Sequence, residues 1–184
     1  MEFEEKTAVK NVVYKGKIIN LRKDDVILPN GKPAVREVIE HSGGCSVLAE
    51  KDGKILLVRQ FRYPYKEVIW EIPAGKINAG ETPDETAARE LEEECGYRAE
   101  KVVKLFEVYP SPAYTDEIIR IYRAEGLVKS KTHLDEDEFL SAVWVEKSEI
   151  KKMIGDGEIK DGKTLIALLF ALSGEIKDSE GKRK

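Results

Sequence analysis

Three glutamates, Glu90, Glu93 and Glu94, lie at spacings that place them together on one face of a helix. Like charges at these spacings destabilise a helix by about 0.2–0.5 kcal/mol per pair, and no lysine is interleaved to offset the repulsion. Clustered carboxylates suit a hard divalent cation such as Mg²⁺, which prefers oxygen ligands and can neutralise and polarise a phosphate. The alternative is a solvated acidic helix face, so the three glutamates leave two interpretations open.

The helix that carries these glutamates is defined by local signals at both ends. Thr82 is a good N-cap, Pro83 suits the first helical position, and Glu85 completes a capping box. Gly96 supplies a C-terminal stop, so the sequence predicts a helix over 83–95. The apolar arc that we expect to be its packing face contains Ala87, Ala88, Leu91 and Cys95.

The other elements follow from the alternation of apolar residues and from turn residues. In the first 40 residues we expect an antiparallel meander, with strands near 12–14, 18–21 and 35–39 and a turn at 29–31. Further strands are expected near 45–49, 54–61, 67–72, 102–109, 117–125 and 139–146. Helices are expected over 148–154 and 163–172, the second apolar enough to be buried, and the polar tail from Glu175 to Lys184 is expected to be frayed.

Length and composition exclude several classes of protein. The 184 residues carry a net charge of −4, which argues against a basic nucleic-acid-binding module. No apolar run reaches the roughly 20 residues of a membrane span, and the acidic start Met1–Glu5 does not resemble a signal peptide, so we expect a cytoplasmic protein. Two cysteines and two histidines leave little material for a zinc site or a Ser-His-Asp triad. A single glutamine beside abundant Lys and Glu predicts a protein from a thermophile.

The residues around the carboxylates extend the pattern to Gly-x5-Glu-x7-Arg-Glu-aliphatic-x-Glu-Glu-x-Gly, from Gly75 to Gly96. This resembles the Nudix box, from which the chain departs only at Tyr97, where an aliphatic residue is usual. The resemblance implies an α/β/α sandwich with a mixed sheet. It also implies hydrolysis of a nucleoside diphosphate linked to another group, with two or three Mg²⁺ ions, or Mn²⁺ in their place.

The same resemblance implies a role for each residue of the box. Glu90, Glu93 and Glu94 would be metal ligands, completed by the backbone carbonyl of Ala74, and Glu93 is also counted among the catalytic residues. A salt bridge between Glu81 and Arg89 would join the loop to the helix. Gly75 and Gly96 would be structural.

Features outside the box resemble the ADP-ribose pyrophosphatase branch of the family. Pro112 lies sixteen residues past Gly96, a spacing associated with that branch, although Ala113 stands where glycine is frequent. The segments 59–64 and 70–77 also resemble this branch, and the N-terminal meander resembles an extension that pairs across a homodimer and contributes to the adenosine pocket. The substrate-binding residues expected on these grounds are Arg62, Arg36, Glu37, Arg59, Glu71 and Pro112.

Several of these residues have a purely structural alternative. Arg62 could stack on adenine and face negative charge, or it could be a surface arginine at a strand end. Arg36 and Glu37 could reach the substrate of a partner subunit or remain surface residues. Arg59 could instead pair with an acidic neighbour, and Pro112 could be an ordinary turn proline.

A general base for the attacking water is expected outside the box, because a metal-ligated carboxylate is a weak proton acceptor. The acidic loop 135–138 lies just before the strand expected at 139–146. In the ADP-ribose pyrophosphatase branch, a glutamate of the corresponding loop approaches the metal-bound water. Counting back from that strand favours Glu138 as the base, with Glu136 second, whereas the alternative is a solvated acidic loop.

A second motif, Gly157–Thr164, matches the phosphate-loop expression Gly-x4-Gly-Lys-Thr. A working phosphate loop follows a buried strand, whereas residues 150–154 are expected to be helical. Glu158 and Asp161 would also face the phosphate oxygens. We therefore interpret this stretch as a turn between two helices.

Together these features predict a Mg²⁺-dependent hydrolase that cleaves ADP-ribose to AMP and ribose 5-phosphate. The alternatives are a pyrophosphatase for another nucleoside diphosphate sugar (GDP- or ADP-hexose) and a Nudix module that binds a nucleotide without hydrolysing it. We divide the chain into an N-terminal extension (1–40), a Nudix domain (41–174) and a flexible tail (175–184). The extension has too little apolar material to close a core alone, which predicts a homodimer with crossing N-terminal strands.

Overall fold

The structure is a computed structural model that describes residues 2–134 and 138–173. The chain forms two compact units, one made of Met1–Gly43 with Tyr109–Ile118 and the other of Gly44–Val108 with Ile119–Lys184. The tail that we expected to be frayed lies outside the described residues. No helix in the described ranges combines the length and the apolar character that a membrane crossing requires.

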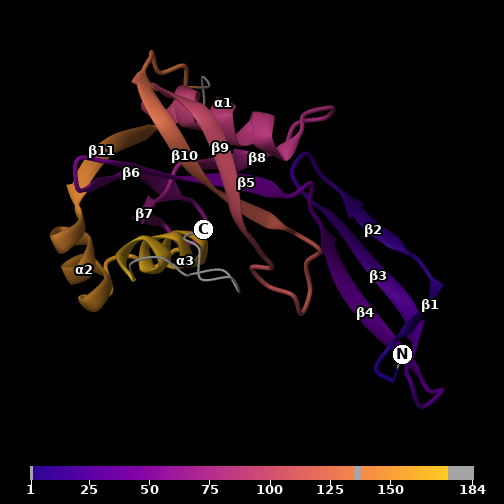
Figure 1. The fold of residues 1–184 in the computed structure, drawn as a ribbon. Coiled ribbons are helices and arrows are strands. Elements are labelled where there is room, and N and C mark those ends of the chain that lie inside the picture. Colours follow the sequence, from indigo (N-terminus) through magenta and orange to yellow (C-terminus); the bar gives the residue numbers. More distant parts are fainter. Residues whose placement is uncertain (1, 135–137, 174–184) are drawn as a thin grey trace, which may run out of the picture. The chain divides into compact units, whose positions relative to one another are not determined.

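The first unit contains a four-stranded antiparallel sheet (Figure 1). Its central strand is β3 (Asn20–Ile27), and β4 (Pro33–Glu40) pairs along one edge of it. The strands β1 (Lys6–Val9) and β2 (Val12–Lys15) follow one another along the other edge. The expected turn between β3 and β4 is present, and Gly31 adopts a φ of +80°, which glycine tolerates without a side-chain clash.

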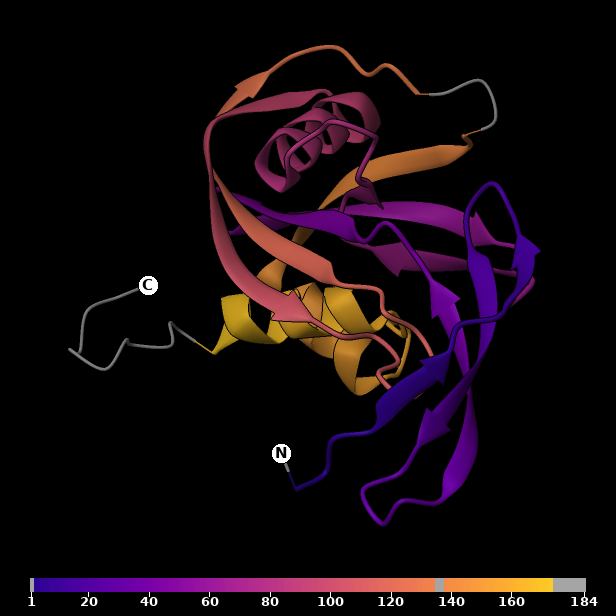
Figure 2. The same ribbon diagram turned by 90° about the vertical axis from the view of Figure 1, so that its right-hand side faces the viewer.

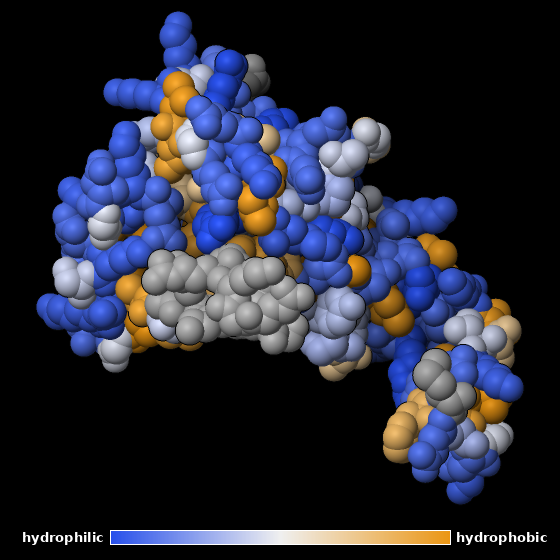
Figure 3. All heavy atoms as spheres, in the orientation of Figure 1, coloured by the Kyte–Doolittle hydropathy of each residue, from blue (hydrophilic) through white to orange (hydrophobic). Residues whose placement is uncertain are grey.

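This sheet has almost no core of its own. Val26 and Asp24 are the buried residues among its strands, whereas many apolar side chains are exposed, and some of these are visible on its surface in Figure 3. The exposed apolar side chains of this unit include Val9, Val12, Val13, Tyr14, Ile18 and Val35. A monomeric sheet of this size normally needs one covered face for stability. The paucity of apolar material expected from the sequence is therefore reflected in the burial pattern.

The second unit is built on a seven-stranded mixed sheet, in the order β11–β6–β5–β10–β9, with β7 paired to β6 and β8 paired to β5. Only the β5–β10 pairing is parallel among these described strands. The strands are β5 (Gly44–Lys51), β6 (Lys54–Arg62), β7 (Glu67–Glu71), β8 (Ala74–Lys76), β9 (Tyr97–Val108), β10 (Ile119–Lys129) and β11 (Leu140–Glu146). The helices are α1 (Pro83–Cys95), α2 (Lys147–Gly155) and α3 (Gly162–Leu172).

The two faces of this sheet pack against different helices, as Figures 1 and 2 show. Successive residues of a strand point to opposite faces, so Val47 and Leu56 pack with α1, whereas their neighbours Leu48 and Ile55 pack with α2 and α3. Helix α1 therefore covers one hydrophobic cluster, and α2 and α3 together cover the other. The predicted α/β/α sandwich with a mixed sheet, accompanied by an N-terminal antiparallel sheet, is confirmed.

Differences from the expected elements are local. The short strands β1 and β8 were not expected, because three or four residues carry too little alternation to be recognised. Helix α3 is only partly buried: Leu169 is 54% exposed, because the helix packs one side on the sheet. The stretch that resembles a phosphate loop connects α2 to α3, as interpreted from the sequence, and no strand precedes it directly.

Candidate active site

Helix α1 is a rigid platform because both of its ends are capped. The Thr82 side chain accepts a hydrogen bond from the backbone N–H of Glu85 at 3.3 Å, and the Glu85 carboxylate accepts one from the backbone N–H of Thr82 at 2.8 Å. At the other end Gly96 takes a left-handed conformation with φ of +68° and donates to the carbonyl of Glu92. The carboxylates between these caps thus project from a fixed backbone.

The three glutamates of α1 differ in burial. Glu90 is 6% exposed and Glu94 is 4% exposed, whereas Glu93 is half-buried. Burial raises the pKa of Glu90 to about 7 and that of Glu94 to about 8, because the charged form loses hydration. Two buried carboxylates therefore lie beside the core, whereas a solvated acidic face would leave its carboxylates exposed.

Arg89 is the cation at the centre of this cluster. Its guanidinium donates to both carboxylate oxygens of Glu81, with distances of 2.7 Å and 2.9 Å. The same group donates to Glu90 at 2.7 Å and to Glu93 at 2.8 Å. These hydrogen bonds from Arg89 lower the pKa of Glu81 to about 2, and they raise the pKa of Arg89. The ion pair expected between Glu81 and Arg89 thus also restrains two of the three glutamates.

Strand β8 forms the opposite wall of the site. The backbone N–H of Ala74 donates to Oε2 of Glu94 at 3.0 Å. A Cβ atom on Gly75 would lie 1.8 Å from Oε1 of Glu90, so no side chain fits at this position while the Glu90 carboxylate stays in place. Because β8 pairs with β5, with Gly75 opposite Cys45, the strand cannot shift freely to relieve such a clash. Glycine at residue 75 is therefore required for Glu90 to keep this position.

Of the two candidate bases, Glu138 is described and half-buried, just before β11, whereas Glu136 lies outside the described residues. Burial is the main cause of the raised pKa values of Glu90 and Glu94, and for Glu90 the charge of Arg89 opposes it. The negative charge of Glu138 is a smaller cause that raises both pKa values. Its carboxylate is thus close enough to the cluster to interact with it electrostatically. Its role as a base stays a prediction.

The donor set fits a hard divalent cation. The side-chain donors are carboxylate oxygens on one helix face, and the two most buried ones carry raised pKa values, so a cation there would offset their burial. Within the described ranges, however, no three acidic, histidine or cysteine side chains are gathered tightly enough to hold an ion as they stand. Instead, Arg89 donates hydrogen bonds to Glu90 and Glu93, and the Ala74 amide donates one to Glu94.

The predicted substrate residues Arg62 and Glu71 lie together. Arg62 donates to Glu71 through Nε at 2.5 Å and through Nη2 at 2.7 Å, a two-pronged pair. Glu71 is 1% exposed and also pairs with Lys163. Burial opposes the charge of Glu71, but the hydrogen bonds and charges of Arg62 and Lys163 outweigh it and lower its pKa. Sequence reasoning missed Lys163 as a partner, since it lies 92 residues away along the chain.

The other predicted substrate residues are not gathered with this pair in the described contacts. Arg59 lies over the ring of Trp70, 5.0 Å from its centroid. In the first unit, Arg36 is exposed and pairs with Glu5, and Glu37 is exposed on β4. Pro112 lies exposed in the turn that begins at Ser111. Substrate contacts by these residues stay predictions.

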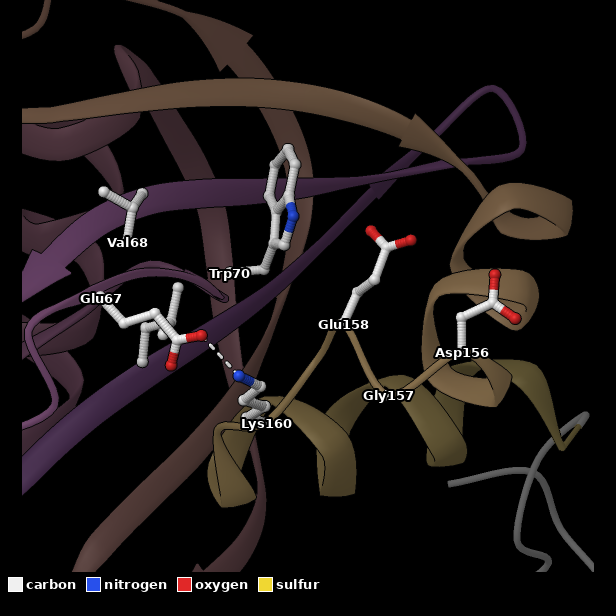
Figure 4. A pocket seen from close by; sticks show the side chains of 8 residues that line it. Glu67, Val68, Trp70, Asp156, Gly157, Glu158 and Lys160 are labelled. Atoms are coloured by element: carbon white, nitrogen blue, oxygen red, sulfur yellow. Dashed lines mark hydrogen bonds and ion pairs between the residues drawn. The ribbon is translucent and has the colours of Figure 1, made fainter.

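Two cavities of the second unit are lined by residues other than the carboxylates of α1. One of about 340 Å³ opens between β7 and the α2–α3 connection (Figure 4), and one of about 270 Å³ lies at the β5–β6 turn beside Tyr97 and Trp144. None of the predicted site residues lines either cavity. The residues that line the first are Glu67, Val68, Ile69, Trp70, Asp156, Gly157, Glu158 and Lys160.

Comparison with known proteins agrees with this geometry. The NUDIX domain family matches residues 41–167, and the nucleoside diphosphate sugar hydrolase N-terminal domain family matches residues 5–39. The chain is 46% identical to an ADP-ribose pyrophosphatase of Bacillus subtilis over 91% of this chain and 92% of that one. It is 43% identical to a methanol dehydrogenase activator of Bacillus methanolicus, again over 91% and 92%.

A solved structure described as an ADP compounds hydrolase shares the fold, with a TM-score of 0.81 at 21% identity, covering 92% of this chain and 93% of that one. The family match covers more than half of the chain and includes every residue of the box, from Gly75 to Gly96. Members of this family generally use divalent metal ions. The chain belongs to the Nudix family.

Proposed function

We propose that the chain hydrolyses the pyrophosphate of ADP-ribose to AMP and ribose 5-phosphate with Mg²⁺, for which Mn²⁺ can substitute. The observation that carries this proposal is the 46% identity to an ADP-ribose pyrophosphatase over nearly the full length of both chains. The intact carboxylate set of α1 supports hydrolysis over simple binding, because a binding module has no need of Glu90 and Glu94 buried beside a like charge.

In this proposal Glu90, Glu93, Glu94 and the Ala74 carbonyl hold two or three ions. Bound cations supply charge neutralisation and polarisation at the phosphorus centre. Glu138 accepts the proton of the attacking water, with Glu136 as the second candidate. Arg62 presents its guanidinium to the substrate, either to a phosphate or to the face of adenine, and Glu71 fixes its orientation.

The first unit is proposed to make a homodimer in which N-terminal strands cross over and Arg36 and Glu37 reach the partner's substrate. Exposed apolar residues such as Val12 and Ile18 support this, because pairing with a second copy would cover them. Light scattering should then give about 42 kDa, twice the 20.8 kDa of one chain, at micromolar concentration. A stable species of 20.8 kDa would count against the dimer.

The substrate class is tested by a panel of nucleoside diphosphate sugars incubated with Mg²⁺ and a phosphatase that releases phosphate only from the monoester products. We expect ADP-ribose to give the highest kcat/KM. A higher value for a GDP- or ADP-hexose would move the assignment to the alternative substrate class. Absence of turnover on the whole panel, with nucleotide binding retained, would favour the non-hydrolysing module.

Two further predictions concern the setting in which the protein works. The scarcity of amide side chains supports an origin in a thermophile, which predicts a melting temperature above the mesophile range of about 45–65 °C. A melting temperature within that range would contradict it. A location in the cytoplasm is also proposed, and fractionation of the source cells checks it.

A further inference from the structure

The connection that resembles a phosphate loop has a different use in this fold. Asp161 is the N-cap of α3, and its Oδ2 accepts from the backbone N–H of Thr164 at 2.9 Å and from the Thr164 hydroxyl at 2.6 Å. The same oxygen lies 3.0 Å from Nζ of Lys163. Asp161 therefore fixes both residues that the motif would have offered to a nucleotide, and neither is left pointing at an open loop.

Thr164 extends this restraint to Ile72, which lies between β7 and β8. Its hydroxyl donates to Asp161 and accepts from the backbone N–H of Ile72 at 2.9 Å, and both Thr164 and Ile72 are fully buried. Ile72 lies just beyond the last paired residue of β7. Since a buried amide without a partner is costly, the Thr164 hydroxyl specifies where this residue sits.

Residues 71–74 lead from β7 into β8, the strand that forms one wall of the proposed metal site. The side chain preceding Ile72, that of Glu71, forms ion pairs with Lys163 and Arg62. The following carbonyl, that of Pro73, accepts from the backbone N–H of Val47 at 2.9 Å. The next amide, that of Ala74, donates to Glu94. Each of residues 71–74 thus makes at least one of these contacts. Glu71 and Ile72 are bound by Lys163 and Thr164, at the start of α3.

We propose that Thr164, with Asp161 and Lys163, is a positioning residue of the active site: through Ile72 and Glu71 it sets the place of Ala74 and Arg62. The four charged groups that take part, Glu71, Arg62, Lys163 and Asp161, sum to zero charge, so the network is neutral when complete. None of the three α3-end residues touches the carboxylates of α1 in the described contacts. Their effect reaches the metal ligands through the backbone of residues 72–74 and through the charges of Glu71 and Arg62, which interact with that of Glu94.

The test compares Thr164→Val, which keeps the shape but removes the hydroxyl, with Thr164→Ser, which keeps the hydroxyl. The affinity for Mn²⁺ alone is measured by calorimetry on the full chain without substrate, next to the melting temperature, kcat and KM. We expect Thr164→Val to weaken Mn²⁺ binding by about 10-fold, the lower end of what outer-shell changes cost, and Thr164→Ser to stay within about twofold of the parent protein.

The matched control is Lys160→Met, which breaks an exposed ion pair with Glu67 in the same connection (Figure 4) and touches none of residues 71–74 in the described contacts. It should leave Mn²⁺ affinity unchanged. The proposal is overturned if folded Thr164→Val binds Mn²⁺ within twofold of the parent protein, or if Thr164→Ser loses as much affinity as Thr164→Val.

Amide hydrogen exchange on the unmodified protein keeps the proposal testable if Thr164→Val does not fold. The amides of Ile72 and Ala74 should exchange as slowly as that of Val47 in the core strand β5, and exchange at the rate of an exposed loop would overturn the proposal. The inference rests on the proposed function for kcat and KM, and on the proposed metal ligands for the Mn²⁺ affinity. A parent protein that leaves ADP-ribose intact, while Thr164→Val still loses Mn²⁺ affinity, would refute the function and support the positioning role.

Discussion

Replacing Gly75 by alanine is a small change that the structure predicts to be severe for the site and mild for the fold. The new Cβ would lie 1.8 Å from Oε1 and 2.0 Å from Cδ of Glu90. Both atoms are at the far end of a flexible side chain, so Glu90 can rotate away without moving the backbone. Residue 75 has no left-handed conformation to strain, because its φ is not among the positive values of the described chain.

The size of the effect follows from these distances. An ordinary contact is about 3.4 Å, so the Glu90 carboxylate must retreat by about 1.6 Å, whereas a Mg²⁺–oxygen bond of roughly 2.0–2.1 Å tolerates little displacement. Gly75→Ala is therefore expected to remove one of the proposed metal ligands. By analogy with the loss of one preorganised charge-stabilising group, about 2.7–4 kcal/mol, kcat/KM should fall by about 10²–10³-fold. The free energy of unfolding should change by only about 1 kcal/mol, since alanine also recovers part of the entropy that glycine loses.

The assay measures kcat/KM on ADP-ribose, Mn²⁺ affinity by calorimetry, and thermal unfolding of the same preparation. Gly155→Ala is the matched control, because a Cβ there meets no atom within 4 Å and the residue ends α2 rather than facing the carboxylates. It should leave affinity and turnover unchanged. If Gly75→Ala keeps Mn²⁺ affinity and turnover within about threefold of the parent protein, the placement of Glu90 in the site is wrong.

Two further predictions concern a base and an ion pair. Glu138→Gln should lower kcat by about 10²–10⁴-fold with KM largely unchanged, since it removes a proton acceptor but no binding group; a large loss in Glu136→Gln instead would move the base by two residues. Glu81→Gln should lower the free energy of unfolding by about 1–3 kcal/mol at pH 7, because the pKa of Glu81 is depressed to about 2 by Arg89. Because the pKa of Glu81 is depressed, its ion pair contributes stability above pH 4.5, and this stability is lost as the pH falls toward 2. The free energies of unfolding of the two proteins, measured with urea, should therefore converge near pH 2. An equal difference at pH 7 and pH 2 would contradict the assignment.

The parts of the structure that were predictable from the sequence are those set by local signals. Helix α1 begins and ends where the capping box and Gly96 place it, because those interactions join residues three or four positions apart. The strand β8 was missed because its three residues are specified by pairing with β5, which no local pattern reveals. The departure at Tyr97 is also explained only by the fold, where its hydroxyl accepts from Trp144 Nε1 at 3.1 Å.

The candidate site divides in the same way. The carboxylates of α1 were predictable from helical spacing, but their unequal burial depends on how α1 packs on the sheet. Glu71 pairs with Arg62, nine residues away, and with Lys163, 92 residues away, and the sequence offers many alternative partners for each of these charged residues. The placement of Arg59 over Trp70 depends on the register in which β6 pairs with β7.

The most direct test of the central claim is product identification with Glu94→Gln as the paired variant. ADP-ribose is incubated with Mg²⁺ and either protein, and the nucleotide and sugar phosphate products are separated and quantified. The account predicts equal amounts of AMP and ribose 5-phosphate from the parent protein, and turnover lower by roughly 10³-fold in the folded variant, because a neutral amide is a poor ligand for a hard cation. Equal turnover by both proteins at saturating substrate and metal, or products other than this pair, would contradict it.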